Sequence, residues 1–472
     1  MKLSNISKAV NGKLFGDDLE IAGLSIDSRL PQKDKIFICF QGKRTNSQKF
    51  VLDAKANGAT AIITENKLSV DIPQIVVGDA RKAYSLAAAE YYGYPQKDMK
   101  IVAVTGTNGK TTTAYLLKKV FDEDGKKAAY IGTLFADYDG KREETSLTTP
   151  DPDVLFELLS KMKQAKVEYV FLEASAHALY LKKLESIVFD AAVLTNVTRD
   201  HLDFFGDMET YADAKKSLFT QERTKLGIIN ADDRVGLEIL KHAEIPCVSY
   251  GLLNPADVFA LDVVHDHGLT FTVNMCDVVF TISTVLYGSY NVENVLAVCT
   301  VAGYFGVKPS SIAAALKNAD VPGRFNVYEN KGVKAVIDYA HTADGLKKLL
   351  LSALDMTKNR LITVFGCGGE RDKGKRAAMG RIAEKYSDYV FITNDNPRSE
   401  NQYEIAAAIE AGMLEDRKKI VLDREEAIKQ AVEMAVEGDV IVIAGKGSEQ
   451  YMEIAGEKIP FQDEAVLKKY FL

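Results

Sequence analysis

One short loop constrains this chain more than any other feature of its sequence. KIVAV (100–104) has the apolar character of a buried strand, TGTNGK (105–110) follows it, and TTTAYLLKKVF (111–121) has the apolar spacing of a helix. A glycine-rich loop between a strand and a helix points its backbone N–H groups, and the positive end of the helix, toward a bound anion. This order therefore predicts an α/β domain that binds the phosphates of a nucleotide.

The loop also carries side chains that suit nucleotide chemistry. Lys110 can reach the outer phosphates, and the hydroxyl of Thr111 is suited to Mg²⁺. The common template G-x-x-x-x-G-K-[ST] would place glycine where Val104 stands, so the loop is a shortened G-x-x-G-K-T variant. The alternative is a glycine turn that opens an ordinary strand–helix unit. We expect the nucleotide to contact Gly106, Thr107, Asn108, Gly109, Lys110, Thr111 and Thr112.

Apolar strands alternate with helical segments along most of the chain, which indicates mostly parallel sheets with helices on both faces. At 472 residues the chain exceeds one ordinary core, and about three domains are expected. A Tyr/Pro/Gly-rich linker and the Pro322–Gly323 pair mark the boundaries. We predict an α/β protein with a small N-terminal domain (1–97), a central P-loop-type domain with a mostly parallel sheet (98–322) and a Rossmann-like C-terminal domain (323–472).

Residues 261–285 break this pattern. The segment LDVVHDHGLTFTVNMCDVVFTISTV shows the alternation of half-buried strands, interrupted by turn residues. We expect an antiparallel insert or sheet edge there.

Charge and cysteine content exclude several classes of protein. The formal net charge of −7 argues against non-specific nucleic-acid binding, which usually needs a basic face. The five cysteines are scattered and odd in number, which fits a reducing cytosol and excludes a cysteine-based zinc site. The start lacks a signal-peptide core, and no apolar run is long enough to cross a bilayer. We expect a cytoplasmic monomer without nucleic-acid or membrane partners.

Motifs beyond the loop point to a family. GTNGKTTT (106–113) resembles the ATP loop of the Mur ligases, a family that also includes the folylpolyglutamate synthases. The resemblance runs nearly end to end, and the set is most similar to the members that add the third residue of the peptidoglycan stem peptide. The other matching segments are DSR (27–29), LTTP (147–150), EASAHAL (173–179), TNVTRDHLD (195–203), YADAKKSLF (211–219), YNVENVLA (290–297), PGRF (322–325), DYAHT (338–342), GCGGERDKGKR (366–376), DNPR (395–398) and GKGSE (445–449).

This resemblance implies an ATP-dependent ligase that acts on small-molecule substrates with ATP and Mg²⁺. The terminal carboxylate of UDP-N-acetylmuramoyl-L-alanyl-D-glutamate would become an acyl phosphate, and the amine of meso-diaminopimelate would then displace the phosphate. Lysine or another amine as acceptor is the nearest alternative. A folylpolyglutamate synthase is disfavoured because its loop usually continues GKGS, whereas this chain has GKTT. A nucleotide-binding subunit of a partner enzyme and a P-loop switch protein are more distant alternatives.

The resemblance also implies a metal site at the ends of two strands. Glu173 ends an apolar strand and His201 follows another, so both belong to the crevice where an open α/β sheet binds ligands. Both can bind Mg²⁺ beside Thr111, and Asp200 is a weaker candidate. The family carries a carbamylated lysine at the position of Lys215, which would become a carboxylate that supports a second Mg²⁺. The expected catalytic residues are Lys110, Glu173, His201 and Lys215.

Further ATP contacts are implied on both sides of the second boundary. Asn291 and Asn294 resemble adenine contacts, since amides suit both donor and acceptor positions of the base. Arg324 can neutralise phosphate charge, Asp338 can accept from ribose hydroxyls, and His341 completes the set. ATP would then bind between the central and C-terminal domains, and domain closure would assemble the site.

Short hydroxyl side chains are implied to hold the UDP-linked substrate. They are Ser28, Thr148, Thr149 and Ser175, although each of them alone is typical of a helix cap or a turn. Lys183 is a further candidate. The family usually has a Gln-x-Arg pair where this chain has Leu181 and Lys183, so the contacts to this substrate are expected to differ here.

DNPR carries the prediction about the acceptor. Arg398 offers a planar fork that pairs bidentately with a carboxylate, and diaminopimelate has a distal carboxylate that lysine lacks. Glu449 suits the distal ammonium group, whereas Ser448 replaces a histidine common in that motif. A simple Asx-Pro turn is the alternative interpretation of DNPR. The expected acceptor contacts are Arg371, Asp395, Asn396, Pro397, Arg398, Gly445 and Glu449.

Overall fold

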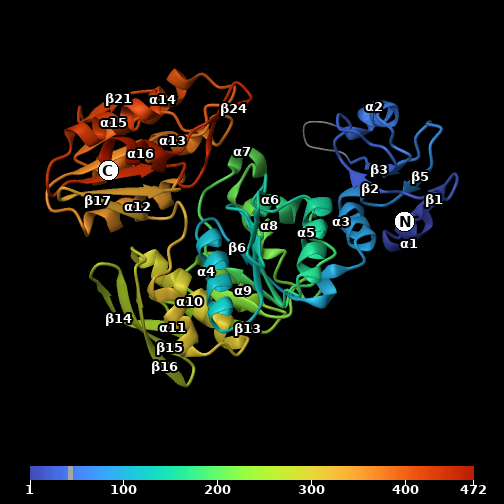
Figure 1. The fold of residues 1–472 in the computed structure, drawn as a ribbon, viewed down its shortest axis with the longest axis horizontal. Coiled ribbons are helices and arrows are strands. Elements are labelled where there is room, and N and C mark those ends of the chain that lie inside the picture. The colour runs from blue at the N-terminus through green and yellow to red at the C-terminus, as the bar shows by residue number, and fades with distance from the viewer. Residues whose placement is uncertain (41–45) are drawn as a thin grey trace.

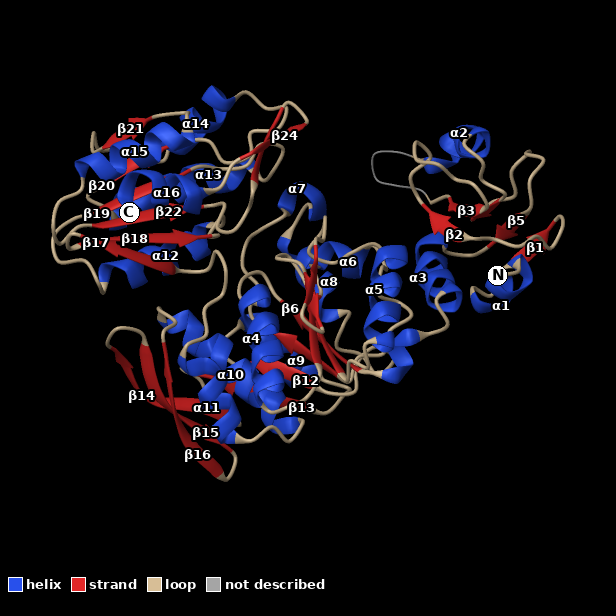
Figure 2. Ribbon diagram, viewed as in Figure 1, coloured by secondary structure: helices blue, strands red, loops and turns tan. Residues whose placement is uncertain are grey.

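The computed structural model describes residues 1–40 and 46–472. Three successive sheets, each flanked by helices, occupy separate parts of the molecule (Figure 1). Figure 2 shows that the central sheet lies between the N-terminal and C-terminal parts and that helices cover the strands in each. The predicted three-part α/β fold class is confirmed, while the exact domain boundaries stay predictions.

The N-terminal sheet is small and mostly parallel. Its strands are β1 (Lys13–Phe15), β2 (Gly23–Ser25), β3 (Lys35–Ile38), β4 (Ala61–Thr64) and β5 (Gln74–Val76). Its helices are α1 (Leu3–Ala9), η1 (Ser47–Phe50), α2 (Val51–Ala56), α3 (Ala80–Tyr91) and η2 (Pro95–Asp98). Within the described residues the strand order is β1-β5-β4-β3-β2, and β1 is antiparallel to β5. The hydroxyl of Tyr84 on α3 donates to Asp153 of the central part at 2.5 Å, which ties the two parts together.

The central sheet contains a long parallel block. Its strands are β6 (Lys100–Thr105), β7 (Ala128–Ile131), β8 (Ala136–Tyr138), β9 (Lys141–Glu143), β10 (Tyr169–Glu173), β11 (Ala191–Leu194), β12 (Gly227–Asn230), β13 (Cys247–Gly251), β14 (Val258–His265), β15 (Leu269–Met275) and β16 (Val278–Thr284). The strand order is β16-β15-β14-β13-β12-β11-β6-β10-β7-β8-β9, and neighbours from β14 to β7 are parallel. The antiparallel strands β14 to β16 form one edge, so the expectation for residues 261–285 is confirmed.

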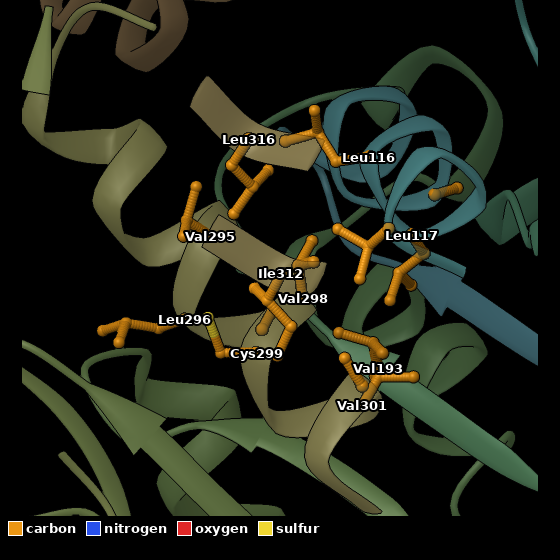
Figure 3. Close-up of a cluster of buried hydrophobic side chains, with 14 of the residues drawn as sticks. Leu116, Leu117, Val193, Val295, Leu296, Val298, Cys299, Val301, Ile312 and Leu316 are labelled. Atoms are coloured by element: carbon orange, nitrogen blue, oxygen red, sulfur yellow. The ribbon is translucent and has the colours of Figure 1, made fainter. Parts of the chain in front are cut away.

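Helices cover both faces of this sheet. They are α4 (Lys110–Glu123), α5 (Pro152–Gln164), α6 (Ala176–Tyr180), α7 (Leu202–Phe205), α8 (Met208–Lys216), α9 (Arg234–His242), α10 (Ser289–Tyr304) and α11 (Pro309–Lys317). Because successive strand residues point to opposite faces, Val102 packs in the core beneath α4 and α10, whereas Ala103 packs in the core beneath α5. Figure 3 shows the first core, where Leu117 of α4 and Val298 of α10 meet Val193 of β11. This packing fixes α4, and with it the loop that precedes α4.

The C-terminal sheet has the same layered design. Its strands are β17 (Asn326–Asn330), β18 (Val333–Asp338), β19 (Leu361–Phe365), β20 (Tyr389–Ile392), β21 (Lys418–Ile420) and β22 (Val440–Ala444), and a separate hairpin is formed by β23 (Tyr451–Ile454) and β24 (Glu457–Pro460). Its helices are α12 (Ala343–Leu354), η3 (Lys373–Lys375), α13 (Arg376–Tyr386), α14 (Gln402–Glu410), α15 (Arg424–Met434) and α16 (Asp463–Phe471). The order is β17-β18-β22-β19-β20-β21, parallel from β18 to β21.

Among the described helices, none combines the length and the apolar character needed to span a membrane.

Candidate active site

A cavity of about 620 Å³ lies between the central and C-terminal parts. Its wall is built from the segments that follow the carboxyl ends of β6, β10 and β11 on one side, and of β18, β19, β20 and β22 on the other. Open α/β sheets bind ligands at this edge of their strands. Two sheets therefore present their ligand-binding edges to one shared cavity.

Glycine is required at two positions of the phosphate loop. Gly106 has a φ of +147°, and a β-carbon there would lie 1.8 Å from the hydroxyl oxygen of Thr195. Gly109 has a φ of +87°, and its β-carbon would lie 2.4 Å from Oδ1 of Asn294. Thr195 Oγ1 donates to the carbonyl of Asn108 at 2.6 Å. The loop is thus packed closely against the end of β11 and the first turns of α10.

The side chain of Lys110 folds back onto this loop and hydrogen-bonds to it. Its Nζ donates to the carbonyl oxygens of Gly106 at 3.0 Å and of Thr107 at 2.9 Å. Burial lowers the pKa of Lys110, and the carboxylates of Glu173 and Asp200 oppose that shift. The predicted phosphate-binding lysine therefore lies on the cavity wall with acidic groups near it.

Glu173 is fully buried at the end of β10, yet its carboxylate borders the cavity. It accepts hydrogen bonds from the Thr111 hydroxyl at 2.9 Å, from the Tyr130 hydroxyl at 2.5 Å, and from the backbone N–H and hydroxyl of Thr133 at 2.9 and 3.1 Å. A β-carbon at Gly132 would lie 2.1 Å from this carboxylate. The paired carboxylate and Thr111 hydroxyl are oxygen ligands of the kind that Mg²⁺ prefers, so the residues present fit that ion.

His201 lies on the cavity wall beside Asp200. Its Nε2 is 3.4 Å from an oxygen of Asp200, and burial lowers the pKa of His201 to about 3. A neutral imidazole retains a lone pair, as a metal ligand must. Burial opposes the ionisation of Asp200, but the hydrogen bond from His341 and the charge of Lys375 hold the pKa of Asp200 well below its usual range.

Lys215 lies behind the phosphate loop on α8 rather than on the cavity wall. Its side chain is buried, and its Nζ donates to the carbonyl of Gly106 at 2.8 Å. Burial lowers the pKa of Lys215 well below its usual value, and the nearby charge of Lys110 adds to that shift. In the described part of the chain, no three His, Cys, Asp or Glu side chains converge as a metal-binding group. Ligands for Mg²⁺ would therefore have to include the Thr111 hydroxyl or oxygens of the substrates.

The predicted ATP contacts of the C-terminal part reach the same wall. Arg324 donates from Nη2 to the hydroxyl of Thr111 at 3.3 Å and stacks on the ring of Tyr339. The carboxylate of Asp338 accepts from the backbone N–H groups of Phe325 at 2.8 Å and Ala340 at 2.7 Å, and burial raises the pKa of Asp338. Asp338 therefore shapes the turn around Arg324 as well as bordering the cavity.

The two predicted adenine contacts have different positions. Asn294 lines the cavity, whereas Asn291 is buried behind it and accepts a hydrogen bond of 2.9 Å from the Asn294 amide. The amide of Asn291 in turn donates to the carbonyl of Tyr287 at 2.7 Å. Asn291 thus orients Asn294 in this structure.

Most of the residues predicted to bind the UDP-linked substrate line the cavity, namely Thr148, Thr149, Ser175 and Lys183. Ser175 caps α6 by accepting from the N–H of Ala178 at 3.2 Å, and Thr149 Oγ1 donates to the carbonyl of Glu173 at 2.7 Å. Lys183 is ion-paired with Asp151 at 2.7 Å. Ser28 lies apart in the N-terminal sheet domain, and its carbonyl accepts from the Asn57 amide at 2.8 Å.

The predicted acceptor residues cluster around the loop after β20. Asn396 donates to Glu449 at 2.9 Å and accepts from the buried Nζ of Lys446 at 3.0 Å. A β-carbon at Gly445, which has a φ of +116°, would lie 2.6 Å from Asp395. The acceptor residues that line the cavity are Arg371, Asp395, Asn396, Arg398, Gly445 and Glu449, whereas Pro397 and the neighbouring Lys446 are not among the described lining residues. The Pro397 carbonyl packs against Gly369, so this proline shapes the loop.

Several wall residues were not predicted from the sequence. His177 packs edge-on against His201 with ring centroids 4.7 Å apart, and burial lowers its pKa to about 4. Lys375 approaches Asp200 at 3.5 Å, and Thr133 contacts Glu173. His177 and Lys375 lie within matching motifs, which was a usable signal. Thr133 lies in no motif and could be placed only by the fold.

Two family descriptions match most of the chain. The Mur ligase middle domain matches residues 104–302, and the domain described as "Mur ligase, glutamate ligase domain" matches residues 323–447.

Curated relatives match over nearly the full length. The UDP-N-acetylmuramoyl-L-alanyl-D-glutamate–2,6-diaminopimelate ligase of Syntrophomonas wolfei is 40% identical over 460 residues, which cover 95% of this chain and 94% of that protein. The enzyme of the same name from Aquifex aeolicus is 38% identical over 453 residues, which cover 95% and 93%. A solved structure of a ligase with this name has a TM-score of 0.67 at 33% identity and covers 97% of this chain and 96% of that one.

Proposed function

The chain belongs to the Mur ligase family, and we propose that it is the MurE-type ligase that joins meso-diaminopimelate to UDP-N-acetylmuramoyl-L-alanyl-D-glutamate with ATP. The predicted family and the predicted class of ATP-dependent ligase are confirmed. The two relatives described above bear the name of this reaction, which supports the choice of substrates. We also propose the three domain boundaries given above and a cytoplasmic, monomeric enzyme that supplies peptidoglycan precursors.

One observation supports this proposal above the others. A single cavity is lined by the phosphate loop, by the hydroxyl cluster of Thr148, Thr149 and Ser175, and by the arginine of DNPR. A ligase that joins a carboxylate to an amine with ATP needs these three binding regions within reach of one reacting carbonyl. We assign them to ATP, to the UDP-linked dipeptide and to the acceptor amino acid, respectively.

The first step is phosphoryl transfer. The terminal D-glutamate carboxylate attacks the γ-phosphorus of ATP, so that an oxygen–phosphorus bond forms, the bond to ADP breaks, and an acyl phosphate results. Lys110 and Arg324 stabilise the charge on the transferring group. Mg²⁺, held by Thr111, Glu173 and His201, would supply further charge neutralisation when bound. We propose that Lys215 is carbamylated and supports a second such ion.

The second step forms the amide bond. The amine of the acceptor attacks the acyl carbon, the carbon–oxygen bond to phosphate breaks, and the departing phosphate can accept the proton of the amine. The C-terminal part forms one wall of the cavity and limits the access of water, which would otherwise hydrolyse the acyl phosphate. The scheme needs no side-chain nucleophile.

Arg398 and Glu449 carry the proposed acceptor preference. Diaminopimelate ends in a carboxylate and an ammonium group, so it matches an arginine and a glutamate in one pocket. Lysine has no distal carboxylate and would bring its ammonium group toward Arg398, which is repulsive. We therefore propose diaminopimelate rather than lysine as the acceptor.

The proposal is tested with the purified chain alone. Phosphate release and peptide formation are measured with the UDP-linked dipeptide and ATP, against a panel of diaminopimelate, lysine and ornithine. The proposal predicts efficient formation of phosphate and tripeptide with diaminopimelate, and only low activity with lysine or ornithine. ADP formation without the dipeptide would contradict the ligase reaction, and equal turnover of lysine would contradict the acceptor. A requirement for a second protein would favour the nucleotide-binding-subunit alternative.

A further inference from the structure

The hairpin β23–β24 holds the backbone of Arg398 in place. The N–H of Arg398 donates to the carbonyl of Glu453 at 2.9 Å, and the N–H of Ala455 donates to the carbonyl of Arg398 at 2.8 Å. The N–H of Glu453 donates to Oδ1 of Asn396 at 2.9 Å. Arg398 has a φ of +52°, a left-handed conformation that a non-glycine residue adopts only when its surroundings support it. The hairpin provides that support.

Glu453 of β23 and the carbonyl of Gly369 hold the Arg398 side chain in place. Its Nε donates to Oε2 of Glu453 at 3.0 Å, and its Nη1 donates to the carbonyl of Gly369 at 2.7 Å. A β-carbon at Gly368 would lie 3.2 Å from Nη1, so the guanidinium packs closely against this glycine segment. No described residue accepts a hydrogen bond from Nη2. Arg398 borders the cavity, and Glu453 is not among the described residues that line it.

This arrangement leaves a defined part of the guanidinium for a ligand. With Nε and one N–H of Nη1 engaged, the end formed by Nη1 and Nη2 retains donors for a carboxylate. An arginine side chain loses substantial rotamer entropy when it is fixed, and a fork that is already oriented loses less on binding. Glu453 also carries a negative charge beside Arg398, which by itself weakens the attraction for an acid. Because Glu453 engages the Nε edge and lies off the cavity wall, we expect its orienting effect to dominate.

We propose that Glu453 is a positioning residue that sets acceptor specificity by holding the Arg398 fork toward the distal carboxylate of the acceptor. This inference rests on the proposed function, because it presumes a dicarboxylic diamino acid as acceptor. It adds a residue that acts through Arg398 and lies on the strand after the GKGSE segment. Glu453 itself contacts neither substrate nor the reacting atoms.

The test compares Glu453→Ala and Glu453→Gln with wild type in steady-state assays with diaminopimelate and with lysine. For Glu453→Ala we expect the KM for diaminopimelate to rise about tenfold, with kcat and the KM for ATP unchanged. Glu453→Gln keeps an oxygen that can accept from Nε, so we expect it to restore most of the affinity. The preference for diaminopimelate over lysine should fall with Glu453→Ala. Glu457→Ala, an exposed change on the other strand of the hairpin, is the matched control and should match wild type.

A double-mutant cycle separates positioning from general damage to the hairpin. If Glu453 acts through Arg398, then Glu453→Ala should change the KM for diaminopimelate very little in an Arg398→Ala background. An equal effect in both backgrounds would overturn the inference, as would an unchanged or lower KM for diaminopimelate in the single variant. Failure of the wild type to use diaminopimelate at all would instead refute the proposed function.

Discussion

Arg324 donates a hydrogen bond of 3.3 Å to the hydroxyl of Thr111, and this contact joins the C-terminal part of the chain to the phosphate loop. The same hydroxyl donates to the Glu173 carboxylate at 2.9 Å. A second connection lies nearby, where Asp200 of the central part is 3.4 Å from His341 and 3.5 Å from Lys375 of the C-terminal part. Both parts of the chain therefore contribute charged groups to one site.

Replacement of Lys110 tests the phosphate loop. Lys110→Ala removes the cation that lies over the loop, and we expect kcat for tripeptide formation to fall by about 10³-fold or more because charge on the transferring phosphoryl group is no longer neutralised. Lys118→Ala, on the same helix but ion-paired with Asp122, is the control and should stay near wild type. Intact peptide-bond synthesis in Lys110→Ala would be incompatible with the proposed role of the loop.

Replacement of Arg398 tests the acceptor pocket. We expect Arg398→Ala to lower kcat/KM for diaminopimelate by about 100-fold, since a bidentate charge-assisted contact is lost, and to leave the low activity with lysine unchanged or raised. Arg381→Ala removes an exposed arginine of α13 and serves as the control. An equal loss of kcat/KM for both acceptors would mean that Arg398 does not bind the distal carboxylate.

The proposed metal site predicts a response to Mg²⁺. Chelation should abolish activity and added Mg²⁺ should restore it. Glu173→Gln keeps the shape of the side chain but removes its charge, and we expect the half-saturating Mg²⁺ concentration to rise by at least about tenfold. Glu168→Gln, an exposed change just before β10, should leave the Mg²⁺ titration as in wild type. Identical titrations of wild type and Glu173→Gln would remove Glu173 from the proposed ligands.

Of two neighbouring lysines on α8, we expect Lys215 to be carbamylated and Lys216 to stay unmodified. Burial lowers the pKa of Lys215, which favours the uncharged amine that reacts with carbon dioxide, whereas the hydrogen bond to Asp213 raises the pKa of Lys216 and favours its protonated form. NMR with carbon-labelled bicarbonate should show a carbamate signal in wild type and in Lys216→Arg. The signal should be absent from Lys215→Arg. A signal that persists in Lys215→Arg would place the modification elsewhere.

We expect the ion pair of Arg376 and Glu400 to stabilise the fold at neutral pH and to lose this contribution in acid. Two hydrogen bonds of 2.8 Å join them, and the guanidinium lowers the pKa of Glu400 to about 2. A carboxyl whose pKa is lowered by folding contributes stability above its unfolded pKa and loses it as the pH falls toward the folded pKa. We expect Glu400→Gln to lower Tm by roughly 2–4 °C at neutral pH, with the difference shrinking below about pH 4. A difference that does not depend on pH would contradict this cause.

Local sequence order was sufficient to predict the phosphate loop and the cavity edge. The loop could be predicted because a strand, glycines and an amphipathic helix follow one another without interruption from Lys100 to Phe121. Glu173 and His201 could be placed because the carboxyl ends of parallel strands meet at one edge of a sheet. The antiparallel edge was visible in the two-residue periodicity of residues 261–285.

Contacts between distant segments could not be predicted in the same way. Lys215 on an amphipathic helix is by default a solvated lysine, and only the packing of α8 behind the loop buries it. Asn291 was expected on the site wall, but which of two asparagines one helical turn apart faces a cavity depends on the rotation of the helix. The pairing of Arg398 with Glu453 depends on a hairpin that folds back across the loop, and nothing in DNPR indicates it.

The formation of an acyl phosphate is tested most directly by the fate of the carboxylate oxygens. The UDP-linked dipeptide is prepared with heavy oxygen in its terminal D-glutamate carboxylate, and the phosphate released during ligation with diaminopimelate is analysed by mass spectrometry. If the carboxylate attacks the γ-phosphorus, one labelled oxygen leaves with the phosphate and the other stays in the new amide. Phosphate without label, together with complete peptide formation, would contradict the mechanism proposed for this site.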